Sequence, residues 1–281
     1  VLNKESGKSL STVLLYLVTP CSILSAFQIE YSSQTRDGLL LAFALGFISL
    51  ICMLVAANLL EHILHLDAVE TVSVIYSNAG NLIIPIVAAI WGRDYVIFCS
   101  AYICLQQFFM WSHGKSVICG EKRIDLKKMF ANVNIIAAAI GMLCFFARIQ
   151  YPAVLDDTIQ WVGDMVGPMA MLITGIQLGG MNRQKLFDFR RVWLIVFIRL
   201  IAFPLMSVLL LRFLPFGASI SAADTIKMIS LLGMVGPTAA NITAMARLYG
   251  NNAEYASVIN VITTLLCIFT IPCMIALFQL L

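Results

Sequence analysis

The stretch YSNAGNLIIPIV, residues 76–87, lies inside one of the most apolar segments of the chain, yet it contains two asparagines, a glycine and a proline. A proline removes one backbone donor and clashes with the preceding helical turn. In hydrocarbon, each backbone group freed in this way is strongly unfavourable unless protein or water satisfies it. A membrane helix that is broken here therefore has to face the protein interior or a hydrated cavity.

The composition indicates that this segment is one of many membrane spans. Hydrophobic residues make up 60% of the chain and charged residues 12%, whereas soluble domains carry about 25% charged residues. Apolar runs of about 20 residues, the length that a helix needs to cross a bilayer, recur from end to end. We therefore predict an all-α polytopic membrane protein. Its nine expected spans are residues 9–28, 38–60, 69–91, 95–112, 132–149, 157–179, 192–214, 225–248 and 255–280.

The distribution of lysine and arginine predicts the orientation of these spans. Most basic residues fall on one side, which the positive-inside rule makes the cytoplasmic side. The connection 113–131 and the N-terminus lie on that side, and the C-terminus is expected outside. We therefore expect a multi-pass protein of the plasma or inner membrane. The chain begins at Val1 with a charged stub that leads straight into a span, so we also expect a missing upstream segment.

Two matching motifs suggest an internal repeat. LVTPCSIL (17–24) and MVGPMAML (165–172) each place a proline, Pro20 or Pro168, inside a long apolar helix. With these motifs aligned, spans six to nine repeat spans one to four, and the fifth span has no partner. A complete protein would then have ten spans in two five-helix halves of opposite orientation, a pattern that marks secondary transporters. The expected division is 1–112 (first half without its first helix), 113–131 (connection) and 132–281 (second half).

The eighth span carries a second break that matches the first. The motif GMVGPTAANITAM (233–245) places Pro237, Thr238 and Asn241 at a depth comparable to Asn78, Gly80 and Asn81 in the third span. Two such breaks can meet, and their half-helix N-termini then present free N–H groups and positive dipole ends. This arrangement suits a carboxylate or another small anion. Asparagine, serine and glycine also join membrane helices, at about 0.6–2 kcal/mol per hydrogen bond, so a packing role stays open for each residue.

At this point the sequence resembles the auxin efflux carrier family. The resemblance is carried by SNAGNLIIPI (77–86), GPMAMLITGIQLG (167–179) and the segment 236–278, which starts GPTAANITAM and contains TIP at 270–272. It covers nearly the whole chain. The short, basic connection around residues 115–128 favours a bacterial-type permease over the plant auxin exporters. A resemblance to bile acid–sodium symporters, which share the plan of crossed helices, is weaker.

The resemblance implies an elevator-type transporter of ten helices in two inverted halves, whose crossed broken helices move against a scaffold. It implies that Pro85 and Pro237 mark the crossing. Asn78, Asn81 and Asn241 become the best candidates for substrate contacts. Thr238 and Gly80 belong to the same candidate site, and Pro20 and Pro168 mark breaks in the scaffold.

Asp164, Arg199 and a glutamine pair lie away from the ends of their predicted spans. Asp164 lies four residues before Pro168, and buried ionisable groups in membranes are functional candidates. It is either a proton-coupling residue or a residue near the outer interface. Arg199 lies seven residues into its span, and we expect its side chain to snorkel to the cytoplasmic interface. Gln106 and Gln107 either form hydrogen bonds between helices, which we favour, or line a transport pathway.

These features favour a secondary carrier of a small organic anion, with that anion and membrane lipids as partners. The alternatives are a transporter-like channel or sensor, or a sodium-coupled symporter of the bile acid type. An intramembrane aspartyl protease needs two buried aspartates, and Asp164 is the one plausible candidate in the sequence, so we do not expect an enzyme. No cofactor, metal site or nucleic acid partner is expected, and a homodimer is possible.

Overall fold

The structure is a computed structural model, and it describes the chain except for residues 1–3, 121–130, 180–189, 218–219 and 221. The described part consists of helices, several of them continued by a short π-helical turn, and no strand is assigned among the described residues. The first part of the chain forms α1 (Lys4–Val13), η1 (Leu14–Val18), α2 (Thr19–Ala26), α3 (Ser33–Leu64), α4 (Ala68–Ile75), η2 (Ala79–Ile83), α5 (Ile84–Trp91), η3 (Arg93–Tyr95), α6 (Val96–Phe109), η4 (Met110–Gly114) and α7 (Lys115–Cys119). The second part forms α9 (Val133–Ala147), α10 (Ala153–Asp164), α11 (Val166–Gly179), α13 (Val192–Phe197), η5 (Ile198–Ala202), α14 (Phe203–Phe213), α15 (Ala223–Val235), α16 (Asn241–Leu248) and α17 (Ala253–Leu280).

Five helical runs of the described residues are long and apolar enough to cross a membrane, which agrees with an all-α membrane protein. They are Ser9–Ala26, Ser33–Leu64, Arg93–Cys119, Val192–Phe213 and Ala253–Leu280. The other four predicted spans are not long continuous helices. One corresponds to the short α9, and three are interrupted, as α4–η2–α5, α10–α11 and α15–α16. The predicted connection 113–131 begins later than expected, because helix continues to Cys119, and residues 121–130 lie outside the described part.

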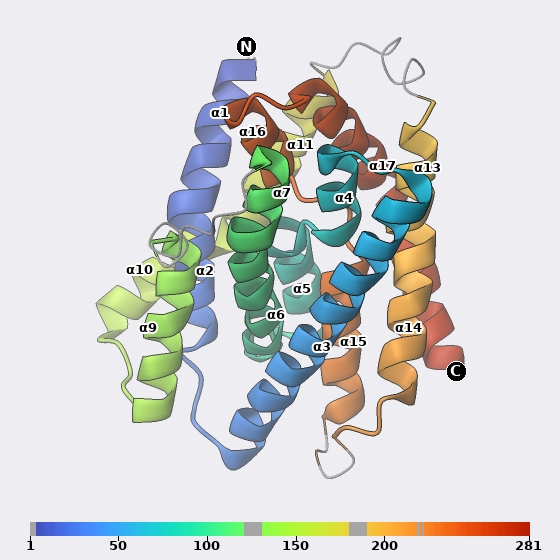
Figure 1. Cartoon of the computed structure of the whole chain (residues 1–281). Helices are drawn as coiled ribbons and strands as arrows, with labels where there is room; N and C mark the ends of the chain where they lie inside the picture. The colour runs from blue at the N-terminus through green and yellow to red at the C-terminus, as the bar shows by residue number, and fades with distance from the viewer. Residues whose placement is uncertain (1–3, 121–130, 180–189, 218–219, 221) are drawn as a thin grey trace.

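The helices form two units that lie side by side. The first, which we call the panel, contains α1, η1, α2, α9, α10 and α11, which pack on one another. Leu14, Val18, Val166, Met169 and Ile173 form a separate small hydrophobic cluster inside it. The second, which we call the crossing unit, contains the remaining helices around a large core, and buried residues of α2 and α9 also belong to that core. Figure 1 shows α1, α2, α9 and α10 on the left, α4 to α6 in the middle, and α13, α14 and α17 on the right.

The start of α4 is fixed by a network of charged and polar side chains. Asp67 caps α4 by accepting from the Glu70 N–H, and Glu70 accepts from the Asp67 N–H, so the two form a capping box. The Glu70 side chain is 1% exposed. The Tyr255 hydroxyl donates to it over 2.8 Å, and the Arg191 Nε lies 2.7 Å from it. Because Arg191 and Tyr255 begin α13 and α17, this network holds three helices of the crossing unit together.

Close helix contact in the panel depends on Gly163 of α10. A Cβ atom at this position would lie 2.8 Å from the Ser22 Cα of α2, which is backbone and cannot yield as a flexible side chain can. The two helices approach closely only because glycine has no side chain, a common feature of packed membrane helices.

We predict that Gly163→Val separates α2 from α10 and lowers the stability by about 1–3 kcal/mol, the range for overpacking a tight contact. The measurement is the midpoint of thermal unfolding of the purified protein in detergent. Gly175→Val is the matched control, because a Cβ atom there meets no atom within 4 Å. An equal loss of stability in both variants would contradict the close contact.

Candidate functional site

The breaks in the third and eighth predicted spans meet, as predicted. Ser77 and Thr238 form an isolated antiparallel β-bridge. The Asn78 N–H donates to the Pro237 carbonyl over 2.8 Å, and the Ala239 N–H donates to the Tyr76 carbonyl over 3.0 Å. Two extended segments thus pair where the helices are interrupted. Four helix ends surround this pair: the C-terminal ends of α4 and α15 and the N-terminal ends of η2 and α16.

Side chains from other helices satisfy the carbonyl groups at the end of α4. The Thr238 hydroxyl donates to the Ser73 carbonyl over 3.1 Å. Arg199 Nη1 donates to the carbonyls of Val74 and Ile75 over 3.0 and 3.2 Å. The Gln106 Nε2 donates to the Ser77 carbonyl over 2.8 Å. Helix C-termini always leave carbonyls without intrahelical partners, and in a membrane they need partners of this kind.

The end of α15 is satisfied in the same way. Arg199 Nη2 donates to the Met234 and Gly236 carbonyls over 2.8 and 2.7 Å, and its Nε reaches the Gly236 carbonyl at 3.0 Å. The Ser77 hydroxyl lies 2.5 Å from the Gly233 carbonyl oxygen, and Asn260 donates to the Thr238 carbonyl over 2.6 Å. The carbonyl groups named here are therefore satisfied by protein donors at both breaks.

The prediction that Arg199 snorkels to the interface is wrong. Its side chain is 0% exposed, and all five N–H donors of its guanidinium group are used on the two broken helices. Snorkelling is favoured where a charged head finds water more readily than protein acceptors. Here four carbonyl oxygens converge on the guanidinium. They belong to helices that are distant from Arg199 in the sequence, so the residues around Arg199 do not predict these acceptors.

The expected hydrogen bonding between helices is confirmed for Gln106. Its amide pairs with the Ser77 backbone in both directions, because the Oε1 accepts from the Ser77 N–H over 3.1 Å while the Nε2 donates to the Ser77 carbonyl. The Gln106 amide thus forms the same pair of hydrogen bonds with the Ser77 backbone that a neighbouring β-strand would form. Gln107 differs, since its Oε1 is buried without a partner among the described residues.

The predicted site residues divide into two groups at the crossing. Asn78, Gly80, Asn81 and Asn241 are partly exposed, and the three asparagine side chains have no hydrogen-bond partner among the described residues. In contrast, Thr238 is 0% exposed and its hydroxyl is engaged by Ser73. In this conformation Thr238 holds the crossing and does not present its hydroxyl to a ligand.

Backbone amides next to these asparagines also lack partners. In the described part of the chain, the N–H groups of residues 79–81 and 240–241 donate to no acceptor outside their own helices. They belong to the first turns of η2 and α16, where intrahelical acceptors do not exist. Together with the asparagine amides they form a set of donors on the N-terminal side of each break.

The proline expected at the crossing in the third span lies elsewhere. Pro85 occupies the first turn of α5, where its missing N–H would have no helical partner in any case. The chain is broken earlier, at residues 76–78, by Tyr76 and Ser77 in the extended pair. Pro237 does lie in that pair, so the two predicted markers are not equivalent. Pro85 instead contacts Gly167 of the panel.

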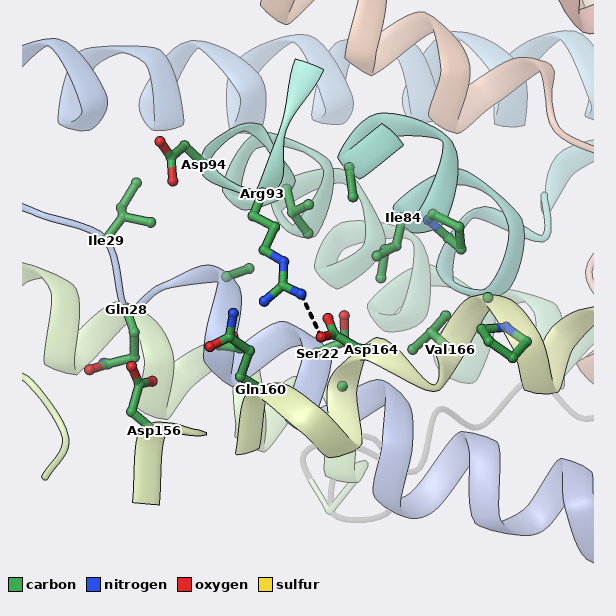
Figure 2. Close-up of a pocket in the computed structure, with 18 residues that line it drawn as sticks. Ser22, Gln28, Ile29, Ile84, Arg93, Asp94, Asp156, Gln160, Asp164 and Val166 are labelled. Carbon is green, nitrogen blue, oxygen red and sulfur yellow. Dashed lines mark hydrogen bonds and ion pairs between the residues drawn. The ribbon is translucent and has the colours of Figure 1, made fainter. Parts of the chain in front are cut away.

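A cleft of about 310 Å³ separates the panel from the crossing unit. Figure 2 shows its labelled side chains, with Arg93 reaching from the α5–α6 junction toward Asp164 and Ser22. The predicted residues Pro85, Asp164 and Pro168 line it, whereas the three asparagines do not. Its lining consists of Ser22, Ser25, Ala26, Gln28, Ile29, Ile84, Pro85, Ala88, Arg93, Asp94, Val96, Asp156, Gln160, Gly163, Asp164, Val166, Gly167 and Pro168.

Asp164 is the last residue of α10 and pairs with Arg93 across this cleft, at 2.5 Å. The side chain of Asp164 is 48% exposed and that of Arg93 54%, so Asp164 is not buried in the helix interior. The two residues are 71 positions apart in the sequence, so no local pattern predicts this ion pair. Asp94 and Asp156 also line the cleft, so its acidic side chains outnumber Arg93 and do not favour an anion in this conformation. Pro20 lies away from the cleft, in the first turn of α2.

The arrangement defines a polytopic helical membrane protein with two crossed, discontinuous helices. A family model described as "membrane transport protein" matches residues 1–123 and 121–275. The chain therefore belongs to this family, the auxin efflux carrier family, which is a family of membrane transporters. No curated protein matches the sequence significantly.

We predict that Gln106→Leu destabilises the crossing, because it leaves the Ser77 N–H and carbonyl without partners. Each buried group left unpaired costs about 1–3 kcal/mol. Gln107→Leu is the matched control and should cost less, since the Gln107 Oε1 has no partner to lose. Thermal unfolding of the two purified variants provides the comparison, and equal effects would show that the Gln106 pairing contributes little.

Proposed function

We propose that this membrane transporter is a secondary carrier of small organic anions, carboxylates in particular, and that it binds them at the N-terminal side of the helix crossing. One observation carries the proposal. The partly exposed asparagine side chains of residues 78, 81 and 241 and the neighbouring backbone amides lie at the positive ends of two half-helices, and none of them has a partner within the described part of the chain. Helix N-termini with free N–H groups favour negatively charged ligands.

Charge at the crossing supports an anion over a cation. Arg199 covers the C-terminal ends of α4 and α15, so the negative ends of these dipoles are balanced. The positive ends of η2 and α16 have no such partner among the described residues. Glu70 is the fully buried carboxylate of the described chain, and it is bonded to Arg191 and Tyr255 at the far end of α4. A carboxylate ligand at the crossing therefore meets donors without a competing buried acid.

Movement of the crossing unit against the panel would expose the site alternately to the two sides of the membrane, as in elevator transport. The cleft, and the small hydrophobic cluster that η1 and α11 form apart from the large core, support such a movement, although α2 and α9 share the large core. Arg93 and Asp164 connect them, and an exposed ion pair of this kind contributes only about 0–1 kcal/mol. Each part of the chain contains one crossing helix that is interrupted, α4–η2–α5 or α15–α16, followed by a further helix, which is compatible with the inverted repeat.

The proposal is tested by a binding screen of the purified protein against malate, malonate, indole-3-acetate and related acids. For a ligand found there, Asn78→Ala and Asn241→Ala should each weaken binding by about 1–3 kcal/mol, because a buried hydrogen-bond partner is lost. Calorimetric titration measures the change in Kd.

Asn58→Ala provides the matched control, since Asn58 is an exposed asparagine of α3, away from the crossing. All three variants should unfold at the wild-type temperature. Unchanged affinity in both crossing variants would place the anion elsewhere.

The elevator movement predicts that a cross-link between panel and crossing unit stops transport. A Cβ atom at Gly167 would lie 3.4 Å from the Pro85 Cβ, close to the roughly 3.5–4.5 Å that a disulfide spans. We expect the pair Pro85→Cys and Gly167→Cys, in a background without the eight native cysteines, to lose uptake into proteoliposomes on oxidation.

Reduction should restore uptake, and each single cysteine variant should be insensitive to oxidation. Full uptake by the oxidised double variant, with the disulfide verified by mass, would mean that these two surfaces do not separate during transport.

A further inference from the structure

Four backbone carbonyls from two broken helices converge on one point inside the crossing unit. They belong to Val74 and Ile75 of the first helix and to Met234 and Gly236 of the second, and each accepts from Arg199 at 2.7–3.2 Å. Groups of oxygen ligands are what hard cations bind in proteins. In transporters with discontinuous helices, unwound carbonyls and half-helix C-terminal ends coordinate coupling cations. This site therefore has the chemistry of a cation site, and an arginine side chain occupies it.

The charge of Arg199 is balanced without a carboxylate. Among the described residues, no acidic side chain lies within ion-pair distance of it. An isolated buried charge would be strongly unfavourable. Each helix C-terminus, however, carries about −0.5 elementary charge, and α4 and α15 both end here, so the two ends together match one guanidinium. The observation that all five donors are used agrees with this balance.

The position of Arg199 in its own helix links a third element to the crossing. It lies in η5, the π-helical turn between α13 and α14. Such turns are rare and frequently occur at functional sites. Because one side chain bonds both broken helices and is anchored in a long, unbroken run, the three elements are held as one body.

We propose that Arg199 is the tethered occupant of a cation site formed by the C-terminal ends of the two broken helices. This fixed cation positions the crossing, and thereby the anion-binding ends on its other side. Arg199 is accordingly a positioning residue that does not touch the ligand. It supplies internally the positive charge that a bound metal ion would otherwise have to supply.

The test is chemical rescue of Arg199→Ala. Removing the side chain leaves four unpaired carbonyls and a space of the size of a guanidinium ion, so the variant should unfold at a lower temperature than wild type. Millimolar guanidinium chloride should raise its unfolding temperature, although guanidinium destabilises proteins in general. Urea has nearly the same shape but no charge, and sodium chloride supplies a charge without the planar donors, so both should raise it less.

Two further variants keep the test independent of how well Arg199→Ala folds. Arg199→Lys retains the charge with fewer donors and should be intermediate in stability. Arg212→Ala, at an exposed arginine of the same helical run, should be unaffected by guanidinium. Equal rescue by urea, no rescue by guanidinium, or a lysine variant no more stable than the alanine variant would overturn the proposal.

A second readout separates positioning from a purely structural role, and it rests on the proposed function. With a carboxylate identified in the binding screen, Arg199→Ala should bind it at least about tenfold more weakly, as expected when bonds to a buried charge are lost, and guanidinium should restore the affinity. Thermal rescue without any change in anion affinity would limit Arg199 to a structural role. Thermal rescue in a protein that binds none of the acids would reject the proposed substrate class while leaving the cation site intact.

Discussion

A backbone polar group inside the membrane needs a partner from the protein or from water in a cavity, because the surrounding hydrocarbon offers none. Two helices break inside the molecule, and each break leaves backbone groups without intrahelical partners. The crossing supplies partners for the carbonyl groups among them. The two extended segments pair with each other through Ser77 and Thr238, and the remaining carbonyls are satisfied by Arg199, Gln106 and Asn260. The rest of the crossing unit surrounds these bonds and keeps water from competing for them.

The crossing is also asymmetric. Its carbonyl ends are covered by a buried cation, while its amide ends retain donors and asparagine side chains that have no partner among the residues the structure describes. A protein that needed only stability would have satisfied both. Strained or unsatisfied groups are expected at functional sites, and here they gather where two helix dipoles point their positive ends. This asymmetry is the basis of the proposed preference for an anion, and no single residue would provide it.

The boundary between panel and crossing unit has a different character from the interior of either unit. Inside the panel, Gly163 permits backbone contact, and inside the crossing unit the bonds at the break are buried and charge-assisted. Across the boundary lie a cleft, an exposed ion pair and a proline–glycine contact. The exposed ion pair is weak, whereas buried residues of α2 and α9 join the large core across the same boundary.

The sequence by itself determined the helical membrane architecture, the family and which two helices break, because apolar run length and polar or proline residues within a run act locally along the chain. It also indicated that Asn78, Asn81 and Asn241 lie beside the breaks. Only the tertiary structure decided that Arg199 is buried, that Asp164 pairs with Arg93, that Thr238 is engaged in holding the crossing, and that Pro85 faces the panel. Each of these depends on acceptors or neighbours from distant parts of the chain, and no local sequence pattern predicts such contacts.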